Sequence, residues 1–153
     1  MPKILDRLLR TAALLAALTV TSVVLAQDSP KPVRLDPEKM AGLNLTAVPP
    51  GAYQQILVAG QLNLRVGTLF QGKELNVSIF ESTPAKTDHR TRPTDVDEFV
   101  YVLSGKLVLT EPDGTRHEYL PGDSLVLPIG YKGTWEMLGN YRELVVLAQK
   151  GAR

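Results

Sequence analysis

The stretch from Asp97 to Val146 limits the possible folds of this chain more than any other part of it. Short apolar runs rich in Val, Leu and Tyr alternate there with breaks of the types Ser-Gly, Pro-Asp-Gly, Pro-Gly-Asp and Gly-Asn. Closely spaced strands joined by tight turns are typical of a small antiparallel barrel or sandwich. The stretch has no helical periodicity, and so it predicts an all-β domain.

The same kind of pattern extends toward the N-terminus and predicts eight or so strands in total. The barrel that they form is expected to begin near Tyr53. The segment 75–81 alternates strictly, which places Leu75, Val77 and Ile79 on one face of a strand. The predicted hairpin connections are Ser104-Gly105 and Pro112-Asp113-Gly114. The other strands are predicted at 53–59, 62–66, 99–103, 106–110, 117–120, 124–127, 134–138 and 142–148.

Residues 1–26 have the pattern of a secretory signal peptide. A basic beginning precedes an almost uninterrupted apolar run from Thr11 to Leu25, and small residues stand at positions −3 and −1 of a cleavage after Ala26. The run is shorter than the roughly 20 residues of a spanning helix, which disfavours the alternative of an uncleaved membrane anchor. We therefore expect a secreted or periplasmic protein without a stable membrane span after cleavage.

The near-neutral charge and the lack of cysteine exclude several classes of function. The net charge of the chain is +1, and loss of the leader with its three basic residues and one acidic residue changes it to −1. Nucleic-acid binding requires a concentrated basic surface, and so we expect no nucleic-acid partner. Because the chain has no cysteine, it has no disulfide, no thiol nucleophile and no thiolate metal ligand.

Residues 27–52 are predicted to form an extended arm that leads into a barrel at 53–150. Five prolines in the arm favour an extended and poorly ordered chain. One short helix is expected within it, with Asp36 as the N-cap, Pro37 in the first helical position and Gly42 just beyond the end. We interpret the arm as a tether without a catalytic role.

Two spaced signatures within the opening stretch resemble those of the cupin superfamily. They are Glu98-x6-Gly105 and Gly122-x5-Pro128-x-Gly130, and the tetrapeptide Gly133-Thr134-Trp135-Glu136 follows them. The tetrapeptide is similar to the branch that includes the ureidoglycine aminohydrolase cupin domain and the ethanolamine-utilisation cupin. The resemblance spans Val77 to Val146. It implies a cupin-type double-stranded β-helix, that is, a jelly-roll barrel with an internal ligand pocket, often dimeric.

The resemblance also implies where a metal would bind, and those positions lack the usual ligands. Metal-binding cupins place a His-x-His pair before the glutamate, with three or four residues between. The three-residue spacing falls here on Arg92 and Thr94, and the four-residue spacing on Thr91 and Pro93. The position of the third histidine is Gly133. A firmly held transition metal requires three or more protein ligands. We therefore expect no standard cupin metal; the alternative is a substitute site at Glu98 and His89, supported by neighbouring aspartates.

Glu98 is the candidate catalytic residue. If its side chain points into the barrel, it shares a face with Val100 and Val102, whereas Phe99 and Tyr101 take the other face. A carboxylate on an apolar face is unfavourable unless it is paired, metal-bound or protonated. Burial would raise its pKa toward neutrality, where a proton-transfer catalyst works best. The alternative is a solvated carboxylate at the start of a strand.

The polar segment 81–97 is interpreted as the rim of a site or as a solvated loop. Its Arg90 and Arg92 favour an anionic or carboxylate ligand through bidentate pairing, unless both are solvated. Trp135 either fills the core or stacks on a flat ligand, with room left by Gly133. His117 is expected at the surface. The candidate ligand-binding residues are Arg90, Arg92, Thr94, Tyr101, Gly133 and Trp135.

Three functions are compatible with these residues. The first is the binding of a small organic molecule in the barrel of an exported protein, without the standard metal. The second is hydrolysis or isomerisation of a small amide, ureido or carboxylate substrate, with Glu98 as acid and base or as a metal ligand. The third is a structural scaffold. A homodimer is expected in each case, and the sequence does not identify the ligand.

Overall fold

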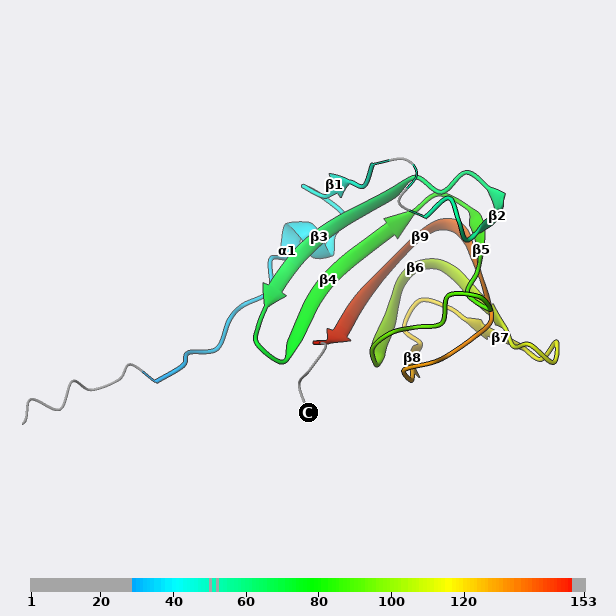
Figure 1. The fold of residues 1–153 in the computed structure, drawn as a ribbon. Coiled ribbons are helices and arrows are strands. Elements are labelled where there is room, and N and C mark those ends of the chain that lie inside the picture. The colour runs from blue at the N-terminus through cyan, green and yellow to red at the C-terminus, as the bar shows by residue number, and fades with distance from the viewer. Residues whose placement is uncertain (1–28, 50, 52, 150–153) are drawn as a thin grey trace, which may run out of the picture. The chain divides into compact units, whose positions relative to one another are not determined.

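Nine strands and one short helix make up the part of the chain that the computed structural model describes, residues 29–49, 51 and 53–149 (Figure 1). The expected signal peptide, residues 1–26, lies outside the described residues. Within the described ranges, no helix is long and apolar enough to cross a membrane. The elements are α1 (Pro37–Met40), β1 (Thr46–Ala47), β2 (Leu57–Gly60), β3 (Leu64–Gln71), β4 (Leu75–Ser82), β5 (Ala85–Asp88), β6 (Glu98–Thr110), β7 (Arg116–Tyr119), β8 (Ser124–Leu127) and β9 (Thr134–Ala148).

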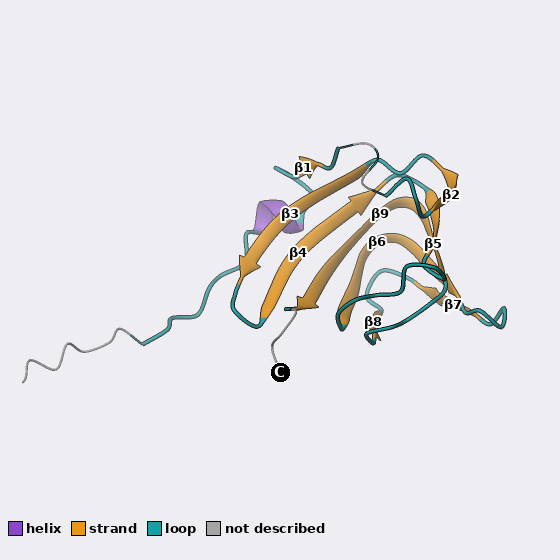
Figure 2. Cartoon of the chain, viewed as in Figure 1, coloured by secondary structure: helices purple, strands orange, loops and turns teal. Residues whose placement is uncertain are grey.

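The strands form one antiparallel sheet that curls on itself (Figure 2). The strand order is β1-β3-β4-β9-β5-β2. Strand β6 lies off this path and pairs with β9, β7 and β8. The first part of β9, residues 134–137, pairs with β5, and the second part, residues 141–148, pairs with β4. On its other edge β9 pairs with β6 along both parts. The prediction of an all-β fold is confirmed.

The two longest strands, β6 and β9, each run through a glycine that the sequence analysis took for a break. The predicted hairpin at Ser104-Gly105 is wrong, because β6 continues through it and stays paired with β9 after a shift in register. Gly105 has a φ of +73°, and a Cβ there would lie 2.6 Å from the Leu138 carbonyl oxygen. On β9, Gly139 also has a positive φ, +69°. The glycines therefore allow a bend and a close approach of two strands, which the sequence does not distinguish from a turn.

The other turn predictions hold better than the strand boundaries. The hairpin at Pro112-Asp113-Gly114 joins β6 to β7, with the Glu111 N–H donating to the Thr115 carbonyl at 2.9 Å. At the first predicted strand, by contrast, residues 53–56 form turns and β2 begins only at Leu57. These turns bury Ile56 at the inner side of the sheet. The displaced boundary therefore adds a wall residue to the site described below.

Alternation along β6 determines which side chains point into the curled sheet. Glu98, Val100 and Val102 are buried, whereas Phe99 and Tyr101 are each 37% exposed, as the period of two predicts. The partners of the three buried residues across β9 are Leu147, Val145 and Glu143. One inner face therefore continues from β6 to β9.

The apolar face of β4 is turned away from that interior, on the side of the sheet where Leu45 of the N-terminal arm packs. Phe80 pairs with Glu143 on the inner face, and so Ile79 points outward, although it is completely buried. Gly67 is the partner of Ile79, and a Leu45 methyl lies 2.5 Å from where a Gly67 Cβ would be. Figure 1 shows α1 and β1 beside β3. Residues 45–47 of the arm thus pack against β3.

The short helix in the arm begins and ends as predicted. The Asp36 carboxylate accepts from the Glu38 N–H at 2.9 Å, Pro37 occupies the first helical position, and Gly42 beyond the end has a φ of +87°. β1 then pairs with β3 through Thr46 and Ala47. This pairing gives part of the predicted extended arm a defined place at the edge of the sheet.

Candidate functional site

A cavity of about 550 Å³ lies on the inner face of the curled sheet. Strands β3, β4, β6 and β9, the turn before β2 and the loop between β5 and β6 all contribute to it. Its size is within the roughly 300–1,000 Å³ of typical small-molecule sites. Its apolar wall consists of Ile56, Leu62, Leu64, Phe80, Met137 and Leu147, and its polar residues are Thr87, His89, Arg92, Thr94, Asp95, Glu98 and Glu143.

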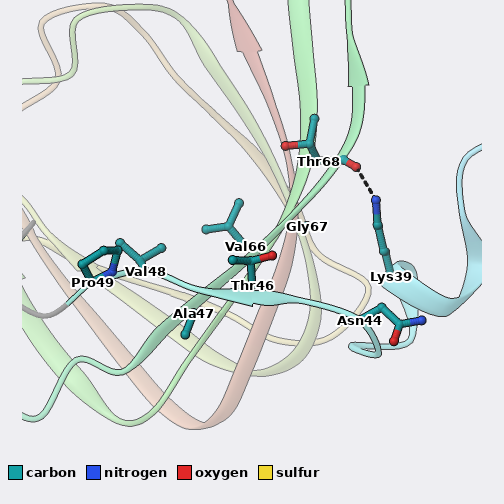
Figure 3. A pocket seen from close by; sticks show the side chains of 9 residues that line it. All are labelled: Lys39, Asn44, Thr46, Ala47, Val48, Pro49, Val66, Gly67 and Thr68. Atoms are coloured by element: carbon teal, nitrogen blue, oxygen red, sulfur yellow. Dashed lines mark hydrogen bonds between the residues drawn. The ribbon is translucent and has the colours of Figure 1, made fainter.

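A second hollow of about 460 Å³ lies where the arm meets β3 (Figure 3). Lys39 is the charged residue in its lining, and its ammonium group already donates to the Thr68 carbonyl at 3.0 Å. No carboxylate, histidine or aromatic side chain is among the described residues that line it. The barrel cavity is therefore the better candidate site, because it combines an apolar wall with several ionisable groups.

Glu98 lies at the polar side of the cavity as the first residue of β6. Its neighbours in the sheet are Leu127 and Leu147, and the residue is only 9% exposed. No hydrogen bond or ion pair joins its carboxyl group to any other residue that the structure describes. Burial, together with the negative charge of Asp95, raises the pKa of Glu98 to about 7.

Glu143 is a second buried carboxyl group in the same cavity, and the sequence analysis missed it. It is 4% exposed on β9, and the Tyr141 hydroxyl donates a hydrogen bond to it. Burial raises the pKa of Glu143 to about 8; the bond from Tyr141 opposes this effect and the charge of Glu98 adds to it. Its position in phase with Tyr141, Val145 and Leu147 was a usable signal in the sequence.

His89 and Trp135 form a stacked pair beside the carboxyl groups. Their ring centroids lie 4.6 Å apart at an interplanar angle of 28°. The His89 Nε2 atom lies 3.1 Å from the Thr87 hydroxyl, and burial lowers the pKa of the imidazole. The Trp135 indole N–H is buried and has no acceptor among the described residues. Trp135 thus packs on a protein ring, and its buried indole N–H is left unsatisfied among the described residues.

The rim of the cavity is fixed by Thr94 and carries Arg92. The Thr94 hydroxyl donates to the Pro128 carbonyl at 2.8 Å and accepts from the Tyr131 N–H at 3.0 Å. Its main role is thus to hold the loop against the turn at 128–131. The guanidinium of Arg92 donates to the Gln55 side chain at 2.9 Å.

Three of the predicted ligand-binding residues do not line the cavity. Arg90 pairs with Asp88 at 2.5 Å, and this pairing lowers the pKa of Asp88 to about 2. Tyr101 points to the outer face. At Gly133 the expected room is filled, because a Cβ there would lie 2.6 Å from the Tyr131 hydroxyl oxygen. The cavity does bring together Arg92, Thr94, Trp135, Glu98 and His89.

The donors around the cavity do not suit the metal that cupins can bind. Among the residues that the structure describes, no three or more His, Asp or Glu side chains are grouped so that they could hold a metal ion. Glu98 and His89 both line the cavity, but Thr87 and Trp135 already contact the imidazole, and Tyr141 is bonded to Glu143. The predicted substitute pair, Glu98 and His89, falls short of the three ligands that a firmly bound transition metal requires.

Comparison with known proteins agrees with this fold. Residues 71–142 match the model of the EutQ-like cupin domain. No curated protein matches the chain. Among solved structures, the chain is similar to a protein of unknown function from Pseudomonas syringae, with 23% identity, a TM-score of 0.60, and coverage of 67% of this chain and 43% of that one.

Two further solved structures are similar. The Clostridium difficile EutQ protein shares 17% identity at a TM-score of 0.54, with 78% of this chain and 82% of that chain covered. A cupin superfamily protein from Desulfitobacterium hafniense shares 19% identity at a TM-score of 0.50, with 76% and 98% covered. At these identities the likeness concerns the fold alone. The curled sheet is consistent with a cupin β-barrel.

Proposed function

We propose that this chain is an exported cupin that binds a small organic molecule in its barrel, without the metal that is usual for such sites. The observation that carries the proposal is the buried Glu98 carboxyl group, which lines the cavity without a hydrogen-bonding partner among the described residues. An apolar pocket with a few convergent polar groups is the usual form of a small-molecule site. Trp135 lines the same cavity, and its buried indole N–H has no acceptor among the described residues.

An enzymatic role is the second candidate, and the pKa of Glu98 favours it. A carboxyl group with a pKa of about 7 gives up and takes back a proton near neutral pH, as a general acid and base must. In this alternative the protein hydrolyses or isomerises a small amide, ureido or carboxylate substrate, in the manner of a ureidoglycine aminohydrolase.

The proposal includes a homodimer that forms through the outer face of the sheet. Phe99 and Tyr101 on β6 are exposed there, and Val126, the partner of Phe99 on β8, is 64% exposed. Adjacent exposed apolar side chains on a sheet are typical of an interaction surface. A purely structural scaffold would use this face alone and leave the cavity without a ligand.

A thermal-shift screen of the purified protein tests the binding function. Ureido compounds, sugar acids, amines and small carboxylates form the set, and we expect at least one class to raise the melting temperature. The same response must weaken in the variant Glu98→Ala. A set without any response would favour the scaffold.

Elemental analysis tests the metal-free part of the proposal separately. We expect less than a stoichiometric amount of transition metal in the purified protein. One equivalent of manganese, iron, nickel or zinc would contradict the proposal, and loss of that metal from Glu98→Ala would identify the glutamate as a ligand.

A further inference from the structure

We propose that the cavity binds a small organic amine, whose ammonium group lies between the carboxyl groups of Glu98 and Glu143. This inference rests on the proposed function, because it names the class of molecule that the same cavity takes. It replaces the anionic or carboxylate ligand that the arginines of the rim favoured in the sequence.

The charges around the cavity favour a cation. Its lining holds three acidic residues, Asp95, Glu98 and Glu143, against one arginine, Arg92. That arginine is at the exposed rim and is engaged with Gln55, while Arg90 is paired with Asp88 away from the lining. A cleft lined mainly by one sign of charge attracts small ions of the opposite sign.

The two buried carboxyl groups lack a basic partner in the part of the chain that the structure describes. No lysine or arginine among the described residues forms an ion pair with Glu98 or Glu143. Tyr141 uses one oxygen of Glu143, and no described residue donates to Glu98. A buried carboxylate is unfavourable unless a cation or hydrogen-bond donors accompany it. A primary ammonium group is compact and brings three donors, enough for both carboxylates.

The groups that face this pair support the same charge preference. On β9, Tyr141 stays neutral because burial raises the pKa of its phenol. On the loop before β6, the charge of Asp95 acts on Glu98. After β5, burial lowers the pKa of His89, and so the imidazole does not compete as a cation near neutral pH. Arg92 at the rim is the remaining basic side chain of the lining.

The apolar wall gives the rest of the ligand its place. Leu62, Leu64 and Phe80 line the cavity together with Met137 and Leu147. The burial of each methylene against such a wall contributes about 0.8 kcal/mol. A short alkylamine therefore fits the cavity, because its ammonium group matches the two carboxyl groups and its alkyl chain matches the apolar wall.

Three probes of equal length separate the possible chemistries: n-butylammonium, n-butanol and butyrate. Isothermal titration calorimetry at about pH 8.5, above the pKa of both carboxyl groups, gives the affinity of each probe for the ionised pair. We expect n-butylammonium to bind at least about tenfold more tightly than n-butanol, because a charge-assisted hydrogen bond is roughly twice as strong as a neutral one. Butyrate is expected not to bind.

Isosteric variants link the preference to the two residues. Glu143→Gln keeps an acceptor for the Tyr141 hydroxyl, and Glu98→Gln breaks no hydrogen bond among the described residues. Each is expected to lower the affinity for n-butylammonium about tenfold and to leave that for n-butanol unchanged. The control is Glu136→Gln, which removes a carboxylate from the opposite face of β9 and should have no effect.

The outcomes separate this inference from the function beneath it. If butyrate or n-butanol binds more tightly than n-butylammonium, or if both glutamine variants bind the amine normally, the amine inference is wrong although the cavity still binds a ligand. If these probes and the whole thermal-shift set fail to bind, the binding function itself is wrong. Circular dichroism of each variant shows that the fold is retained.

Discussion

Two groups of charged residues on opposite faces of the same sheet differ in how their carboxylates are satisfied. On the outer face, Glu81 accepts from Arg142 at 2.7 and 2.9 Å and from Arg65 at 2.8 Å. On the inner face, Glu143 has Tyr141 as its hydrogen-bonding partner and Glu98 has none among the described residues. The carboxylate of the outer group has its charged partners within the protein. The two inner carboxyl groups have no charged partner among the described residues, and so each needs a proton or a ligand to be stable when buried.

The outer group also helps to hold the arm. The Arg142 guanidinium lies where a side chain at Gly42 would be, with the Nη2 atom 2.2 Å from the position of a Cβ. The glycine therefore serves two purposes, a helix end with positive φ and a close approach to Arg142. This contact assigns the outer carboxylate a structural role and leaves the ligand chemistry to the inner face.

The largest expected effect is the pH dependence of stability that the inner pair causes. Because the folded-state pKa of Glu143 is raised from 4.5 to about 8, its contribution to the free energy of unfolding is fully present below pH 4.5. It is lost progressively as the pH rises from 4.5 through 8, by about 5 kcal/mol in total. Urea unfolding between these pH values measures the loss.

The variant Glu143→Gln should flatten most of that pH dependence and be more stable than the wild type above pH 8. The matched variant on the other face, Glu81→Gln, should instead lower the stability at pH 8, because its arginines lose a charged partner. If both substitutions change the free energy of unfolding at pH 8 in the same direction and by the same amount, the inner and outer carboxylates do not differ as described.

The next effect concerns the outer group. Arg142→Ala leaves the half-buried Glu81 with one arginine and loosens the contact with Gly42, and so we expect a loss of about 2 kcal/mol in the free energy of unfolding. Arg116→Ala is the control, because its ion pair with Glu118 is exposed. If both variants unfold at the same denaturant concentration, the outer ion pairs do not hold the arm.

The smallest effect is expected for Trp135→Phe, which removes the unpaired indole N–H. Without ligand, its stability should stay within about 1 kcal/mol of the wild type, since the loss of packing area is offset by the removal of an unsatisfied donor. The affinity for n-butylammonium should not change, whereas that for 4-aminobutanoate should fall, because its carboxylate can accept from the indole. Calorimetry with both compounds checks this, and an equal fall for both would show that the indole acts through packing.

The sequence was sufficient to predict the all-β fold and one of the two buried carboxyl groups, that of Glu98. Alternation placed Glu98 with Val100 and Val102 on the inner face, and the structure has them there. The same alternation also places Glu143 with Val145 and Leu147 in the predicted strand 142–148, but the break assumed near Gly139 hid that this strand continues to Trp135 and Met137. A glycine in a strand is compatible with a turn or with a bend, and the pairing partner decides between them.

The contacts of the rim could not be obtained from the sequence. His89 stacks on Trp135, 46 positions away, and Thr94 bonds to Pro128 and Tyr131. These contacts depend on how the sheet curls, which is set by long-range pairing of β5 and β6 with β9. For the same reason, the basic rim suggested an anionic ligand: the nearby aspartates were visible in the sequence, but the pairing of Asp88 with Arg90 was not.

Burial raises the pKa of the Glu98 and Glu143 carboxyl groups to neutral pH or above, because no described lysine or arginine pairs with either of them. Carbon-13 NMR of the glutamate side-chain carboxyl groups, titrated from acid to alkaline pH, tests these raised pKa values most directly, with Glu98→Gln and Glu143→Gln to assign the signals. We predict that the Glu98 signal titrates at about pH 7 and the Glu143 signal at about pH 8. Titration of both signals near pH 4.5, as for ordinary glutamates, would contradict the account.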